Sequence, residues 1–158
     1  MTTSIALSFE VLTDKSSHDN LRLRLGPYHH TCDSFYLDID DSPTASSDLR
    51  TDLARLLEQW RSQVDELKGT GGTAYLPYDF SDECTGWLRV TSTDGHNADV
   101  QAGWSWVNGW TFLPSDYLTT APEITDFDPE ANARIECTLE DLSQRIAANA
   151  NTITTPRQ

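Results

Sequence analysis

The sequence predicts an α+β fold of about seven mostly antiparallel strands with one long and one short helix, in the order βββ-α-ββββ-α. Several short segments alternate apolar and polar residues, which is typical of strands with one buried face. One segment carries a leucine-rich stripe at spacings of three and four, which indicates an amphipathic helix. The length of 158 residues favours one domain with its own hydrophobic core. We expect this domain to cover residues 1–150 and a flexible tail to cover residues 151–158.

Three strands are expected before the long helix. Alternation of apolar and polar residues marks the first at Ile5–Val11, and alternating leucine and arginine marks the second at Leu21–Leu25. Gly26-Pro27 is expected to end the second strand. The third is predicted at Phe35–Ile39. The connections are short, which favours an antiparallel meander.

A helix of about five turns is predicted over residues 47–68. Ser46, Ser47 or Asp48 can supply the N-cap, and the glycines of the Gly69–Gly72 segment end the helix. The residues expected to pack this helix onto the sheet are Leu53, Leu56, Leu57, Trp60 and Val64.

A second block of strands is expected after the helix, at about 74–78, 87–93, 98–106 and 110–113. Asn108-Gly109 predicts a two-residue hairpin turn between the last two strands. A three-residue loop in the Thr93–His96 turn pairs Val90 with Val100 and leaves one apolar face and one polar face. An irregular strand is considered around 133–137. The short helix is predicted at 138–149, with a capping box that begins at Thr138.

This register divides the aromatic residues between the two faces of the second strand block. Trp104 and Trp106 fall on the face expected beneath the long helix. The opposite face carries Trp87, Trp110 and Phe112. Two interpretations of that second face stay open: the C-terminal helix covers it, or it forms an interaction patch.

The chain is strongly acidic, with 25 acidic and 11 basic residues and a net charge of −14. A surface of this sign repels phosphate backbones, so we expect no nucleic-acid partner. No apolar run approaches the ~20 residues of a membrane-spanning helix, so we expect no membrane partner. Three interpretations of the acidity compete: a base-composition or salt adaptation, a surface for a basic partner, and cation binding. Composition alone does not separate the first two.

The sequence predicts neither a metal site nor an enzyme, and no cofactor. Cys32, Cys84 and Cys137 lie about fifty residues apart, which argues against a disulfide framework and favours the cytoplasm. His29, His30 and Cys32 come nearest to a metal cluster, but no second ligand pair accompanies them, and we expect these histidines in an exposed loop. Cys84 follows two acidic residues, which raise a thiol pKa, and the chain has no Gly-x-Ser-x-Gly motif.

The order of motifs resembles small uncharacterised bacterial proteins that are grouped with the immunity proteins of polymorphic toxins. The resemblance covers about residues 49–147. It is carried by the leucine-rich helix with Trp60, by Trp87-Leu88-Arg89-Val90, by the Asp94-Gly95-His96 turn and by the Thr138–Leu142 helix start. It implies a non-enzymatic, single-domain protein that binds and blocks one toxin.

We therefore expect a cytoplasmic, non-enzymatic acidic binding protein, monomeric or weakly homodimeric, that neutralises a basic protein partner, with a toxin as the first candidate. The alternative is a small-molecule-binding or small enzymatic domain, with a pocket between sheet and helix lined by Trp104, Trp106 or Tyr78. The residues expected to bind the protein partner are Trp87, Arg89, Trp110, Phe112, Asp126 and Asp128.

Overall fold

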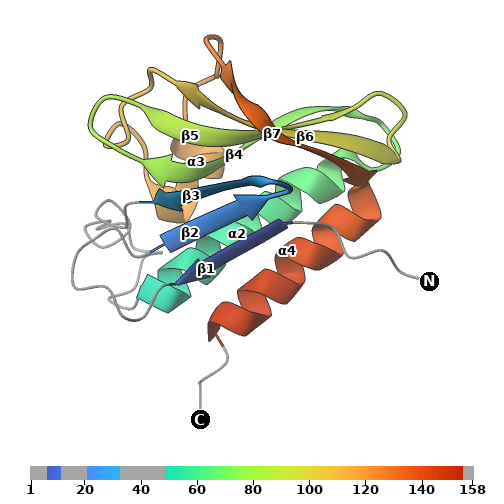
Figure 1. Cartoon of the computed structure of the whole chain (residues 1–158), viewed down its shortest axis with the longest axis horizontal. Helices are drawn as coiled ribbons and strands as arrows, with labels where there is room; N and C mark the ends of the chain where they lie inside the picture. Colours follow the sequence, from blue (N-terminus) through green and yellow to red (C-terminus); the bar gives the residue numbers. More distant parts are fainter. Residues whose placement is uncertain (1–6, 12–20, 33–48, 155–158) are drawn as a thin grey trace.

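The computed structural model describes residues 7–11, 21–32 and 49–154, which form two antiparallel sheets and their helices (Figure 1). The three-stranded sheet has the order β1-β2-β3, with β1 at Leu7–Val11, β2 at Leu21–Leu25 and β3 at Tyr28–Cys32. The four-stranded sheet has the order β4-β5-β6-β7, with β4 at Gly72–Phe80, β5 at Thr85–Ser92, β6 at Asn97–Ser105 and β7 at Asp128–Thr138. The predicted α+β class with seven antiparallel strands is confirmed.

Two long helices support these sheets. Figure 1 shows the three-stranded sheet lying over α2 and α4, with the four-stranded sheet above it and β3 on the side nearest β4. The described helices are α2 at Leu49–Leu67, the 3-10 helix η1 at Pro114–Asp116, the short α3 at Tyr117–Thr120 and α4 at Leu139–Thr154. Helix α3 was not expected from the sequence.

The N-terminal sheet corrects one prediction about its strands. Gly26-Pro27 ends β2 as predicted, but it does so in a tight turn that leads directly into β3, because Leu25 pairs with Tyr28. Gly26 has a φ of 58°, a conformation that glycine adopts at little cost. His29 and His30 therefore lie on β3, not in the predicted loop. The strand predicted at Phe35–Ile39 lies outside the described residues.

Helix α2 packs as its leucine-rich stripe predicts. All five of its predicted core residues are buried, and Trp60 also donates a hydrogen bond from Nε1 to the carbonyl oxygen of Pro77 on β4, at 2.9 Å. The helix ends where expected, with the Gly71 amide donating to the Leu67 carbonyl at 2.8 Å. Gly69 and Gly71 both have positive φ.

The four-stranded sheet confirms the predicted β5–β6 register and corrects the strand that follows. Val90 pairs with Val100 and Leu88 with Ala102, as expected. The chain leaves the sheet after Ser105, however, and residues 106–113 form neither the predicted Asn108-Gly109 hairpin nor a strand at 110–113. The fourth strand is instead β7, which includes the segment considered around 133–137.

Helix α4 begins at its predicted cap and continues beyond its predicted end. The Thr138 hydroxyl accepts a hydrogen bond from the Asp141 amide at 3.0 Å. The helix runs to Thr154, and Ile153 is buried, so helical structure extends past the boundary drawn at residue 150. None of the helices in the described segments is long and apolar enough to cross a membrane.

Candidate functional site

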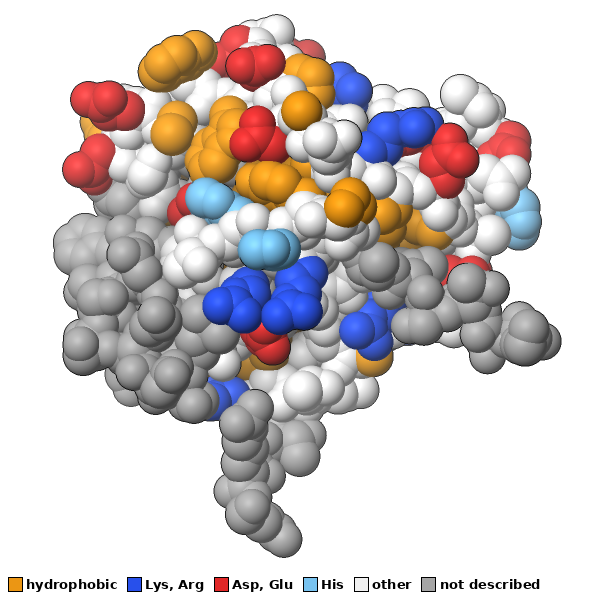
Figure 2. All heavy atoms as spheres, viewed as in Figure 1, with side chains coloured by type: hydrophobic (Ala, Val, Ile, Leu, Met, Phe, Trp, Pro, Cys, Tyr) orange, Lys and Arg blue, Asp and Glu red, His pale blue; other side chains and the backbone are white. Residues whose placement is uncertain are grey.

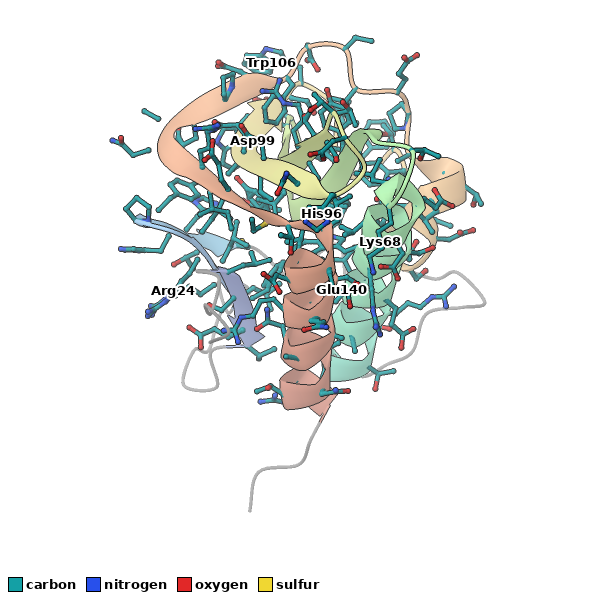
Figure 3. All side chains as sticks on the ribbon, turned by 90° about the vertical axis from the view of Figure 1, so that its right-hand side faces the viewer. Arg24, Lys68, His96, Asp99, Trp106 and Glu140 are labelled. Atoms are coloured by element: carbon teal, nitrogen blue, oxygen red, sulfur yellow. The ribbon has the colours of Figure 1, made fainter. Side chains whose placement is uncertain are left out.

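Two tryptophans stand out as the most exposed large apolar side chains of the described segments. Trp106 is 77% exposed and Trp110 is 61% exposed. Figure 3 places Trp106 at the end of the molecule that lies farthest from helix α4. Trp106 follows the last residue of β6, and its backbone amide donates to the Asp126 carboxylate at 2.8 Å. This hydrogen bond fixes an acidic side chain beside an exposed aromatic one.

Gly109, which precedes Trp110, contacts the backbone of a second acidic segment. The Gly109 amide donates to the carbonyl oxygen of Ser81 at 2.7 Å, in the turn between β4 and β5. A Cβ atom at position 109 would lie 2.6 Å from that oxygen, so only glycine allows this approach. The same turn carries Asp82 and Glu83, and both are exposed.

We call this surface the aromatic–acidic edge. It consists of Trp106, Trp110, Asp82, Glu83, Asp126 and Asp128, all of them exposed. The surrounding sequence carries few positive charges: between Lys68 and Arg134, Arg89 is the only basic residue among ten acidic ones. Figure 2 shows acidic and hydrophobic side chains interspersed along the upper left of the molecule, whereas a group of basic side chains lies near the centre of the view.

The structure removes Trp87 and Phe112 from the predicted partner-binding surface. Both are buried, and their rings stack with centroids 5.6 Å apart. The indole Nε1 of Trp87 also donates to the Ser105 hydroxyl at 2.9 Å. The second face of the sheet is therefore covered, but by Phe112, Phe127 and the chain around them instead of the C-terminal helix.

The other four predicted partner-binding residues remain at least partly accessible. Trp110, Asp126 and Asp128 belong to the aromatic–acidic edge. Arg89 is half-buried, and its guanidinium carbon lies 4.7 Å from the centroid of the Phe127 ring. It lines a groove of about 810 Å³ with polar walls that include Asp99 and Glu136. Arg89 is thus held by Phe127 and does not extend from the edge.

Sequence reasoning missed Trp106 because it carried β6 one residue too far. The Asn108-Gly109 motif favoured a hairpin, and a hairpin would have continued the alternation of faces through Trp106. Trp104, by contrast, is half-buried, and it lies at the junction of the two sheets. Its ring lies 6.1 Å from that of Tyr78 and 5.3 Å from that of His30.

A second group of side chains lies where the two sheets meet and could hold a metal ion. His30 and Cys32 come from β3, and Asp79 comes from β4. Their potential ligand atoms lie within 4.8 Å of one another. His30 Nε2 donates to Asp79 Oδ2 at 2.8 Å. Sequence analysis singled out His30 and Cys32, but it had no means of identifying Asp79, which is 47 positions away from Cys32.

Burial also raises the pKa of Tyr78, which lies beside this group. Desolvation raises the pKa of Tyr78 well above its usual range, with further contributions from Tyr28, Cys32 and Asp79. The Tyr78 hydroxyl thus stays protonated and can act as a hydrogen-bond donor.

Comparisons of the chain with models of known protein families, with curated proteins and with solved structures found no match.

Proposed function

We propose that the protein binds a basic protein partner through the aromatic–acidic edge. The observation that carries this proposal is the exposure of Trp106 and Trp110 among carboxylates, in a stretch of sequence that is almost devoid of positive charge. Exposed tryptophan is the residue type most enriched among the energetic anchors of protein interfaces. Neither side chain is buried in the core of the described segments.

The arrangement suits a partner that presents lysine or arginine. The two indoles offer apolar area and ring faces over which a cation can lie. Asp126 and Asp128 on one side, and Asp82 with Glu83 on the other, offer carboxylates for charge-assisted hydrogen bonds. Carboxylates at the rim of an interface chiefly increase the association rate, and buried aromatic residues chiefly slow dissociation.

On the resemblance to toxin immunity proteins, we propose that the basic partner is a toxin. A protein of that kind would occupy a basic surface of one toxin and block its action. Many toxins that act on nucleic acids need such a basic surface for their own substrate. The aromatic–acidic edge would then compete with the substrate for the same positive charges.

Affinity capture with matched variants tests the proposal. Tagged wild-type protein should retain a basic protein from the native lysate, and the Trp106→Ala, Trp110→Ala double variant should lose it. Leu118→Ala is the matched control, because Leu118 is an exposed apolar residue on α3, outside the edge. Equal recovery by the double variant and the control would refute the edge as the binding surface. Retention of acidic or neutral proteins alone would refute the basic partner.

Binding kinetics with the captured partner separate the two parts of the surface. Asp126→Asn with Asp128→Asn should slow association, and the effect should shrink as salt rises because screening weakens the attraction. Trp110→Ala should mainly speed dissociation. Glu58→Gln, on the exposed face of α2, removes one charge outside the edge and should change neither rate by more than about twofold. Equal effects of Glu58→Gln and the double aspartate variant would show that net charge acts without a defined site.

A further inference from the structure

The junction of the two sheets carries a compact group of nitrogen, sulfur and oxygen donors that is independent of the aromatic–acidic edge. His30 and Cys32 are two residues apart on β3, so both side chains point to the same face of the strand. That face meets β4, where Asp79 follows an irregularity in the strand pairing between Pro77 and Asp79. The alternate residues of β3, His29 and Thr31, are exposed.

Of the three donor residues, only His30 is partly exposed to solvent. Cys32 is 0% exposed, and Asp79 is also buried. The His30 side chain remains 29% exposed. A completely buried thiol is a poor nucleophile toward an external substrate, because reactive cysteines need access and an electropositive environment. The group is therefore better suited to hold an ion than to perform covalent catalysis.

A buried phenol lies beside the three donors. Tyr78 is 1% exposed, and its hydroxyl lies close to that of Tyr28, without a well-formed hydrogen bond in the described part of the chain. Its ring lies 6.2 Å from that of His30.

The fold makes room for this tyrosine at a specific position. Tyr78 packs over Gly86, which pairs with Asp79 on the neighbouring strand. A Cβ atom at position 86 would lie 2.6 Å from the Tyr78 ring, so a side chain there would push the ring out of place. The glycine thus keeps the hydroxyl at the junction.

We propose that His30, Cys32 and Asp79 bind a zinc ion that links the two sheets. Thiolate and imidazole donors favour zinc over magnesium or calcium, which prefer sites made of oxygen. Three protein ligands leave a fourth tetrahedral position for water, and the Tyr78 hydroxyl is available to hydrogen-bond it. Binding releases the thiol proton of Cys32 to solvent. It also ends the direct His30–Asp79 hydrogen bond, because the neutral imidazole must carry its single proton on Nδ1 for Nε2 to bind the ion.

The required movements are small. Tetrahedral zinc holds its ligand atoms at about 2.0–2.3 Å, which sets those atoms about 3.3–3.6 Å apart. The His30 Nε2 and Asp79 Oδ2 atoms, now 2.8 Å apart, would separate slightly, and any pair near the 4.8 Å limit would approach by about 1 Å. Side-chain rotation supplies displacements of this size without moving either strand.

Cobalt substitution tests the site on the full-length, reduced protein after treatment with a chelator. We expect one equivalent of Co²⁺ to produce both the thiolate charge-transfer absorption and the strong visible bands of a tetrahedral ion, and Zn²⁺ to displace it. Cys32→Ser should abolish the charge-transfer band. His30→Gln and Asp79→Asn should each weaken binding at least tenfold. The matched controls are Cys137→Ser and His29→Gln, which remove the same residue types elsewhere, and both should bind Co²⁺ as the wild type does.

Thermal unfolding provides a second measurement if Cys32→Ser does not fold. Zn²⁺ at a hundredfold excess over its Kd should raise the Tm of the wild type by about 5–10 °C, because only the folded state holds the three ligands together. His30→Gln should lose this shift, and His29→Gln should keep it. Absence of saturable binding, an octahedral cobalt spectrum without a thiolate band, or equal losses in the controls and the ligand variants would overturn the proposal.

Discussion

Replacement of Trp60 by alanine tests the core that joins α2 to the four-stranded sheet. Trp60 is buried almost completely and packs against Phe9, with ring centroids 5.5 Å apart. Its indole N–H donates to the Pro77 carbonyl at 2.9 Å. One side chain therefore contacts the three-stranded sheet and hydrogen-bonds to the four-stranded sheet.

The expected loss of stability follows from this packing and this hydrogen bond. Truncation of a buried tryptophan to alanine lowers the free energy of unfolding by about 3–5 kcal/mol. The loss has two parts: the transfer free energy of the removed atoms and the cost of the cavity that remains. For a chain of this length, that corresponds to a Tm lower by about 6–20 °C. Trp60→Phe keeps an aromatic ring but leaves the Pro77 carbonyl without this donor. We expect a cost of about 1–3 kcal/mol for that variant.

Urea unfolding followed by far-UV circular dichroism measures both variants without relying on tryptophan fluorescence. Trp106→Ala is the matched control, since Trp106 is exposed and its removal should change the free energy of unfolding by less than about 0.5 kcal/mol. A loss below about 1 kcal/mol for Trp60→Ala, or a loss in Trp106→Ala as large as that in Trp60→Ala, would refute the placement of the core.

Three further outcomes are expected. Gly86→Ala should lower the stability by about 1–3 kcal/mol in the same urea assay, since its Cβ meets the Tyr78 ring at 2.6 Å. Gly109→Ala should change the fluorescence of the exposed tryptophans, because the Ser81 carbonyl leaves no room for a Cβ and the loop must move. Hydrogen bonds from the backbone amides of Asn97 and His96, and from the Asn97 side chain, lower the pKa of Asp94 from 3.8 to about 2. A depressed carboxyl pKa contributes stability above the unfolded value, and this is lost as pH falls toward 2. Asp94→Asn should therefore flatten the acid limb of the unfolding profile between about pH 4 and pH 2, and an unchanged limb would contradict the assignment.

The sequence by itself determined the elements whose hydrophobic pattern is continuous. The apolar residues of helix α2 form a stripe along one side of the helix, and this stripe predicted the bounds of the helix and its core residues. The β5–β6 register followed because only one loop length gave a uniformly apolar face with Val90 opposite Val100. Periodicity reports which side of an element is buried, and here that information was sufficient.

Only the tertiary structure decided what lies beyond the range of local patterns. Gly26-Pro27 is equally compatible with a loop and with a tight turn into another strand, and the choice depends on whether the residues that follow pair with β2. The chain leaves the sheet after Ser105, before the predicted hairpin, and Trp106 is exposed while the Gly109 amide bonds to Ser81. The proximity of His30 and Cys32 to Asp79 arises from packing between β3 and β4. Such contacts join residues distant in sequence, and their free energy depends on a geometry that no local spacing of residues encodes.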